Sequence, residues 1–191
     1  SDVCSSDLEW SRPATVTVSG GKVQDVLDAD VGLGSLDADR VIDASGQLVL
    51  PGGVDPHFHL AIPLGAFLTQ DDFESGTLAA LAGGTTTVVD FAIPAVGEGV
   101  VDALDAKLRM GRDSRCDYAF HGVINTSLDD ATSVVGEFVA RGVRTVKLFT
   151  TYRGELMVST STIEAVMRAL TEVQGLTYVH AEENEIGRAH V

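Results

Sequence analysis

Two histidines that stand two residues apart, His57 and His59, have a spacing that metal chemistry can use. On an extended strand, residues i and i+2 project to the same side, so both imidazoles would aim at one point. The apolar residues 48–50 lead into this stretch, and Gly52 and Pro56 predict that it ends a strand and does not begin a helix. Paired histidines also occur on ordinary exposed strands. The pair alone therefore leaves a metal site and a plain strand both open.

Lys147 lies inside the apolar run 145–149, which is an unusual place for a charged side chain. An ammonium group has only donors and cannot ligate a metal, and burying it without a partner is costly. A buried lysine that loses its proton can instead react with carbon dioxide, and the resulting carbamate has two oxygens that can bridge two cations. The alternative is a lysine that reaches solvent or pairs with an acid such as Asp90. Both interpretations remain open from these residues alone.

Apolar, β-rich runs recur along the chain at intervals of about 30 residues, the length of one βα unit. They are residues 86–91, 118–123, 145–149 and 176–180. Helical patterns fall between them, at residues 71–81, 100–108, 134–139 and 162–174. Together with the His57 strand, this predicts an α/β fold: the first five βα units of a TIM-type (β/α)8 barrel, whose full circle takes about 250 residues.

The catalytic groups of such a barrel lie at the carboxyl ends of its strands. His57 and His59 end the first predicted strand, Asp90 ends the second, Lys147 lies on the fourth and His180 ends the fifth. We therefore expect these side chains to meet at one end of the partial barrel.

Residues 9–50 have a different pattern, with short strands and turns that predict part of a small β-sandwich. Residues 15–18 and 22–27 flank a Ser-Gly-Gly turn, and residues 40–43 and 47–50 resemble a second hairpin. The predicted division is a sandwich segment at residues 9–50 and a partial barrel segment at residues 51–184.

The two ends of the chain look foreign to both segments. Residues 2–8 and 185–191 can be encoded by one nucleotide string and its reverse complement, which resembles a translated sequencing adapter. We therefore expect residues 1–8 and 185–191 to be artefacts that pack against nothing.

The overall composition excludes several classes of partner. The chain has 191 residues and a net charge of −15, which argues against binding nucleic acid or an anionic membrane surface. No window approaches the apolar length of a membrane span. The two cysteines, Cys4 and Cys116, give no disulfide framework and predict a cytoplasmic protein.

Five collinear motifs resemble the hydantoinase/dihydropyrimidinase branch of the amidohydrolase superfamily. They are GGVDPHFHL at 52–60, DDFESGT at 71–77, AGGTTT at 82–87, VKLF at 146–149 and VHAE at 179–182. The resemblance implies a binuclear zinc hydrolase that opens small cyclic amides or imides, such as hydantoins or dihydropyrimidines, and that forms a homo-oligomer, a tetramer or dimer.

The resemblance also implies roles for individual residues. His57, His59 and carboxylated Lys147 (N6-carboxylysine) would bind one zinc, and Lys147 and His180 would bind a second. Tyr152 would donate a hydrogen bond to the amide oxygen as it becomes anionic. The family's sixth-strand histidine and eighth-strand aspartate would lie beyond this span, so we expect an incomplete second site and a chain that is inactive alone. His121 and Cys116 are interpreted as a structural histidine and an inert buried thiol.

Two other functions remain as alternatives. A dihydroorotase- or allantoinase-like enzyme would place an arginine or another polar group soon after the histidine pair, where residues 60–64 are apolar. A non-catalytic assembly protein of the dihydropyrimidinase-related type would have lost metal ligands, whereas all four expected within this span are present.

Overall fold

The computed structural model describes residues 12–31, 36–64 and 67–188, and it divides the chain into two compact units at residues 1–49 and 50–191. The predicted artefact at residues 1–8 lies outside the described part of the chain.

The first unit contains an antiparallel hairpin of β1 (Ala14–Ser19) and β2 (Lys22–Asp28). Gly20 and Gly21 join the strands with φ of 58° and 73°, a left-handed conformation that glycine adopts without a steric penalty. The predicted second hairpin at residues 40–50 is wrong, because these residues form a turn but no strand. Their apolar side chains, such as Ile42 and Leu48, are exposed, and a strand pattern forms a strand only where a neighbour pairs with it.

The second unit is built on a parallel sheet of five strands in the order β3-β6-β7-β8-β9. The strands are β3 (Gly53–Phe58), β6 (Thr85–Ala92), β7 (Asp117–Val123), β8 (Thr145–Phe149) and β9 (Leu176–His180). Each neighbour in the sheet is the next strand of the βα series, which confirms the predicted partial TIM-type barrel. A small antiparallel pair, β4 (Pro63–Leu64) and β5 (Phe67–Leu68), follows β3 and was not predicted.

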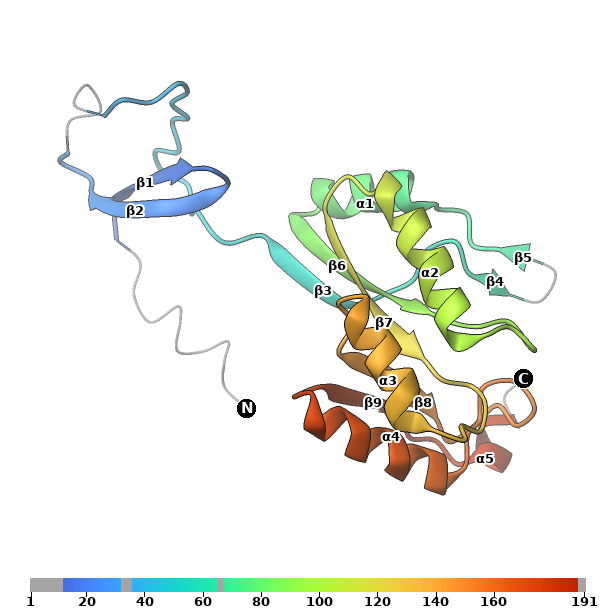
Figure 1. Cartoon of the computed structure of the whole chain (residues 1–191). Helices are drawn as coiled ribbons and strands as arrows, with labels where there is room; N and C mark the ends of the chain where they lie inside the picture. The colour runs from blue at the N-terminus through green and yellow to red at the C-terminus, as the bar shows by residue number, and fades with distance from the viewer. Residues whose placement is uncertain (1–11, 32–35, 65–66, 189–191) are drawn as a thin grey trace. The chain divides into compact units, whose positions relative to one another are not determined.

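Four helices cover one face of this sheet (Figure 1). They are α1 (Phe73–Ala82), α2 (Val100–Met110), α3 (Ala131–Ala140) and α4 (Thr160–Glu172). Asp72, Asp130 and Ser159 cap α1, α3 and α4 by accepting a hydrogen bond from a backbone N–H of the first turn. A 3₁₀ turn (Gly111–Asp113) follows α2, and a short helix α5 (Asn184–Arg188) follows β9.

The alternation of side chains along the strands creates two environments. The outer face packs against the helices and forms the main hydrophobic core, with Phe120, Leu148 and Phe138 among its buried members. The opposite face carries a smaller cluster of Phe91, Val123 and Phe149. This second face holds the candidate site.

Among the described residues, no helix is long and apolar enough to cross a membrane. Of the predicted artefact at residues 185–191, the structure describes residues 185–188 within α5, where Ile186 is exposed. The assignment of these residues to an adapter stays a prediction.

Candidate active site at the carboxyl ends of the strands

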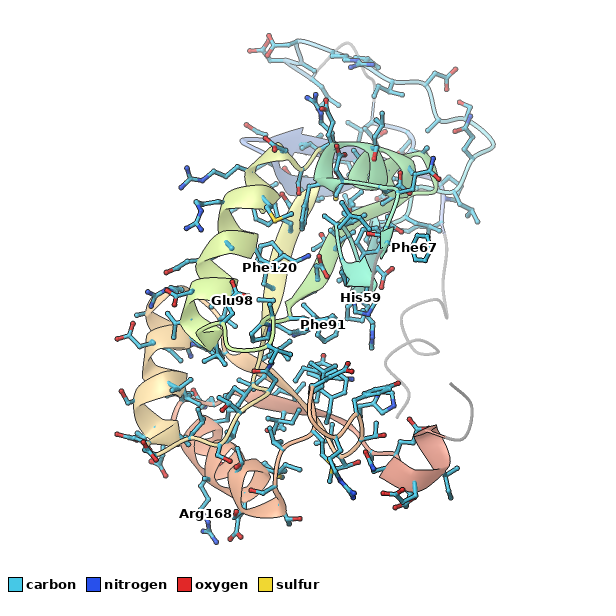
Figure 2. The ribbon with its side chains drawn as sticks, turned by 90° about the vertical axis from the view of Figure 1, so that its right-hand side faces the viewer. His59, Phe67, Phe91, Glu98, Phe120 and Arg168 are labelled. Carbon is cyan, nitrogen blue, oxygen red and sulfur yellow. The ribbon has the colours of Figure 1, made fainter. Side chains whose placement is uncertain are left out.

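His57 and His59 lie together at the carboxyl end of β3, as their spacing predicts. Their ring centroids are 5.1 Å apart, and both rings contact the ring of Phe91 on the neighbouring strand β6. Figure 2 shows His59 and Phe91 on the side of the sheet away from α2, whereas Phe120 lies on the helix side. The backbone N–H of His57 donates to Asp55 Oδ1 at 3.0 Å, which fixes the strand end that carries the pair.

Lys147 is buried on the same face of the sheet, with only 7% of its surface exposed. Its Nζ atom lies 5.7 Å from the ring centre of Phe91 and 5.1 Å from that of Phe149, within the range of cation–π contacts. No acidic side chain in the described part of the chain forms a salt bridge with it. Burial lowers the pKa of this lysine, so the uncharged amine is more accessible than in water.

The alternative pairing of Lys147 with Asp90 is wrong. Asp90 points to the opposite face of the sheet, where it accepts a hydrogen bond from Lys107 of α2 at 2.8 Å. Side chains of successive strand residues alternate between faces, and Phe91 takes the face that carries Lys147. Asp90 is therefore unavailable to Lys147.

His180 lies at the carboxyl end of β9 and stacks on Phe149, its partner on β8, with ring centroids 5.6 Å apart. Its Nε2 atom is 2.8 Å from Glu182 Oε2, which leaves Nδ1 without a partner among the described residues. The Thr150 side chain donates to the backbone carbonyl of His180 and so ties the ends of β8 and β9 together.

The four predicted ligands affect one another electrostatically. Burial lowers the pKa of His57, and the nearby His59, Lys147 and His180 lower it further, while Asp55 acts in the opposite direction. Three imidazoles and one ammonium group thus share one end of the sheet. Positive charge gathered at this end of the sheet is unfavourable unless an anion is also part of the site.

The donor set fits a metal only under one condition. Among the described residues, no group of three His, Cys, Asp or Glu side chains is close enough to hold an ion. Imidazoles suit zinc, whereas the ammonium of Lys147 does not. Conversion of Lys147 to a carbamate would supply the missing anionic oxygens at the position that the ammonium now holds.

Tyr152 follows β8 with a φ of 63°, a left-handed conformation that is costly for a bulky residue. Its ring contacts those of Phe149 and His180 edge-on, at centroid distances of 6.1 and 5.6 Å. The next residue, Arg153, donates its backbone N–H to the buried side chain of Asn184 at 3.0 Å. The loop is therefore held so that Tyr152 lies beside a candidate metal ligand.

His121 lies on the same face but has both ring nitrogens engaged. Its Nε2 donates to the carbonyl of Pro56 at 2.9 Å, and Nδ1 lies 2.6 Å from Thr145 Oγ1. Burial lowers its pKa and favours the neutral ring. This geometry supports the structural role predicted for His121.

Cys116, predicted to be an inert buried thiol, is only half-buried. The pKa of its thiol is raised mainly by burial and also by the negative charge of the neighbouring Asp117.

Sequence reasoning missed the buried pair of Asp90 and Lys107 at the edge of the site. A signal for it was present in α2, where Lys107 continues the spacing of the buried residues Val100, Ala103 and Leu104. A lysine on the buried face of a helix requires a buried partner. Asp90, in the otherwise uncharged second strand, is the acidic partner of Lys107.

The sequence pattern of the family described as "Amidohydrolase family" matches residues 48–189. The chain belongs to this family. It is 37% identical over 149 residues to a D-hydantoinase of Geobacillus stearothermophilus, covering 77% of this chain and 32% of that protein. It is 35% identical over 188 residues to a dihydropyrimidinase of Rattus norvegicus, covering 93% of this chain and 35% of that protein.

A solved structure of a D-hydantoinase (dihydropyrimidinase) from Thermus sp. matches with a TM-score of 0.83 and 28% identity, over 92% of this chain and 38% of that chain. The resemblance to the hydantoinase/dihydropyrimidinase branch is thereby confirmed. The chain spans about a third of the length of these curated relatives.

Proposed function

We propose that the protein containing this chain is a binuclear zinc hydrolase that opens cyclic amides of the hydantoin or dihydropyrimidine type. The observation that carries this proposal is the buried Lys147 between two aromatic rings, on the face of the sheet where His57, His59 and His180 also lie. The names of the relatives support the reaction class, because they are D-hydantoinases and dihydropyrimidinases.

Lys147 would act as a carbamate. The ammonium first loses one proton to solvent, and the neutral amine then attacks carbon dioxide. An N–C bond forms as one C=O π bond of carbon dioxide opens, and a second proton leaves to solvent, so that a cation becomes an anion. The lowered pKa of Lys147 favours the amine that this step needs. The change in sign also removes the repulsion between Lys147 and His57.

His57, His59, the carbamate of Lys147 and His180 would hold two zinc ions, which supply Lewis acidity and an activated water for attack on the ring carbonyl. Tyr152 would donate its phenolic hydrogen to the amide oxygen as negative charge develops there. The aromatic rings of Phe91 and Phe149 exclude water from the lysine and so strengthen the electrostatic interactions in the site.

The substrate is proposed to be a neutral ring with an apolar substituent. Residues 60–64 after the histidine pair are apolar, and the β4–β5 hairpin presents Phe67 and Leu68 with 79% and 66% of their surfaces exposed. A carboxylate substrate, as in dihydroorotase chemistry, would need a cationic side chain in this segment, and residues 60–64 provide none. Homo-oligomerisation is proposed from the family resemblance of the motifs, and a cytoplasmic location is proposed from the low cysteine content.

The proposal is tested by supplying the purified full-length protein that contains this chain with zinc and ¹³C-bicarbonate. We expect a carbamate carbon signal, zinc that remains bound after dialysis, and opening of dihydrouracil or a 5-substituted hydantoin. Lys147→Met should abolish the signal and the bound zinc, because methionine fills the same space without an amine. Lys22→Met, on the exposed strand β2, is the matched control and should change neither. A protein that takes up neither carbon dioxide nor zinc would contradict the proposal.

A further inference from the structure

Asp90 and Lys107 form a buried ion pair directly behind His59. Lys107 Nζ lies 2.8 Å from Asp90 Oδ2, and the two side chains are 11% and 1% exposed respectively. Lys107 also lies over the ring of Phe73, with Nζ 5.3 Å from the ring centre. The pair joins helix α2, which carries Lys107, to strand β6, which carries Asp90. It lies next to Leu60, the residue that follows His59.

The pair holds the backbone of Leu60 at both polar atoms. Lys107 Nζ donates to the carbonyl of Leu60 at 2.6 Å, and the N–H of Leu60 donates to Asp90 Oδ2 at 3.3 Å. The other carboxylate oxygen, Oδ1, accepts from the N–H of Phe91 at 2.6 Å. Every oxygen of Asp90 is therefore oriented by the fold, and the position of the carboxylate relative to β3 is fixed.

Oδ1 of this fixed carboxylate also faces His59, with Nδ1 of the imidazole 3.6 Å away. The two atoms lie just beyond hydrogen-bond distance, so a small shift of the imidazole brings an Nδ1–H to the carboxylate. We propose that Asp90 is a positioning residue for His59. The Asp90 carboxylate accepts a hydrogen bond from the Nδ1–H of the imidazole, so that Nε2 is free to face a cation. Lys107 holds the carboxylate in this position.

Histidines that bind metals usually donate their other ring N–H to a carboxylate or carbonyl, which selects the tautomer and orients the ring. His59 is 44% exposed and has no hydrogen bond to either ring nitrogen among the described residues, so little else orients it. The role in metal binding rests on the proposed function, whereas the choice of tautomer can be tested without any metal.

The competing interpretation is that the pair only stabilises the fold. The two roles separate in the double variant Asp90→Asn/Lys107→Met. Single loss of either partner leaves an unpaired buried charge, which is strongly destabilising, while removing both charges together relieves that penalty. The double variant should fold, yet it lacks the carboxylate for His59.

The first experiment measures the imidazole tautomers of the metal-free full chain by long-range ¹H–¹⁵N NMR at about pH 8, above the ordinary histidine pKa. We expect His59 to carry its proton on Nδ1 in the unmodified chain and to shift toward the Nε2 form in the double variant. The matched control is Asp105→Asn/Arg141→Met, which removes the ion pair between α2 and α3 on the surface and should leave the tautomer unchanged. An unchanged His59 tautomer in the Asp90 double variant would overturn the proposal.

The second experiment titrates the full-length protein that contains this chain, unmodified and with the same two double substitutions, with Zn²⁺ in bicarbonate buffer. We expect the Asp90 double variant to bind zinc about 10- to 100-fold more weakly than the unmodified chain, and the control to bind equally well. Equal affinity in the Asp90 double variant would refute the positioning role. If the full-length protein that contains the unmodified chain binds no zinc, the proposed function fails, and the tautomer measurement still decides the role of Asp90.

Discussion

His121 on β7 donates a hydrogen bond to the carbonyl of Pro56 on β3, although β6 lies between these two strands. The side chain therefore spans an intervening strand on the inner face of the sheet, and its other nitrogen contacts Thr145 on β8. Because Pro56 precedes His57, this contact holds the strand end that carries the candidate ligands. Its neighbours are aromatic: the rings of Phe91 and Tyr178 lie 4.7 and 4.6 Å from that of His121.

Replacing His121 by phenylalanine should destabilise the protein, because the carbonyl of Pro56 and the hydroxyl of Thr145 lose their hydrogen bonds to the imidazole while the ring volume stays similar. We expect the free energy of unfolding to fall by about 1–3 kcal/mol, measured by urea denaturation. The control is Arg168→Gln, since Figure 2 shows Arg168 pointing away from the molecule and its pair with Glu164 is exposed. The control should change stability by less than about 0.5 kcal/mol. Equal stabilities of the two variants would show that His121 does not hold β3.

The same histidine predicts how stability depends on pH. Burial lowers the pKa of His121 below its ordinary value of 6.5, and the bond to Pro56 offsets part of this effect. Below about pH 6.5 the unfolded chain therefore binds a proton that the folded chain does not. Stability should be fully present above this pH and should decrease as the pH falls from 6.5 through the lowered pKa.

The measurement is urea denaturation at intervals between about pH 8 and 5, a range that brackets the ordinary histidine pKa. In His121→Phe the decrease should be shallower, with a remainder that comes from His57, whose pKa is also lowered. An identical slope in the variant and the unmodified protein would contradict the assignment.

Much of the fold could be predicted because the strand patterns, the helical spacings and the helix caps all indicated the same series of βα units. Largely apolar runs such as 145–149 predict strands buried on both faces, and Asp72 and Gly83 bound α1 as its sequence indicates. The prediction of a hairpin at 40–50 was wrong because a strand-like sequence pattern shows only that a segment can form a strand. It does not show that a neighbouring segment is available to pair with it. The two-residue strands β4 and β5 are too short for any periodicity to reveal.

The sequence predicted that the four candidate ligands lie at one end of the sheet, because strand ends in a parallel sheet meet at one edge, and their metal roles stay a prediction from the family resemblance. The partner of Asp90 could not, because the choice between Lys147 and Lys107 depends on which face of β6 the carboxylate takes. That face is set by strand register, in which Asp90 pairs with Phe120 of the outer core. A single-residue change in register would have reversed the assignment.

Gly122 and Gly136 offer a matched pair of glycine substitutions that tests the packing of α3 on the sheet. A Cβ atom at Gly122 on β7 would overlap the ring of the fully buried Phe138 on α3, whereas one at Gly136 within α3 would meet nothing within 4 Å. Gly122→Ala should destabilise by about 1–3 kcal/mol through overpacking. Gly136→Ala should stabilise by about 0.5–1 kcal/mol, because alanine loses less backbone entropy in a helix. Thermal denaturation compares the two, and destabilisation of similar size in both would show that steric overlap is not the cause.

Tyr152→Phe tests the proposed chemistry without disturbing the fold. The ring contacts with Phe149 and His180 remain in the variant, so its melting temperature and zinc content should match those of the unmodified protein. If the phenol stabilises the developing oxyanion, kcat for hydantoin opening should fall by about 10²–10³-fold with little change in KM, because the interaction forms mainly in the transition state. Tyr178→Phe is the control, since Tyr178 contacts the structural His121 and has no assigned role in the reaction. A Tyr152 variant that loses zinc instead would mean that the tyrosine orders His180, and an unchanged kcat would remove it from the reaction altogether.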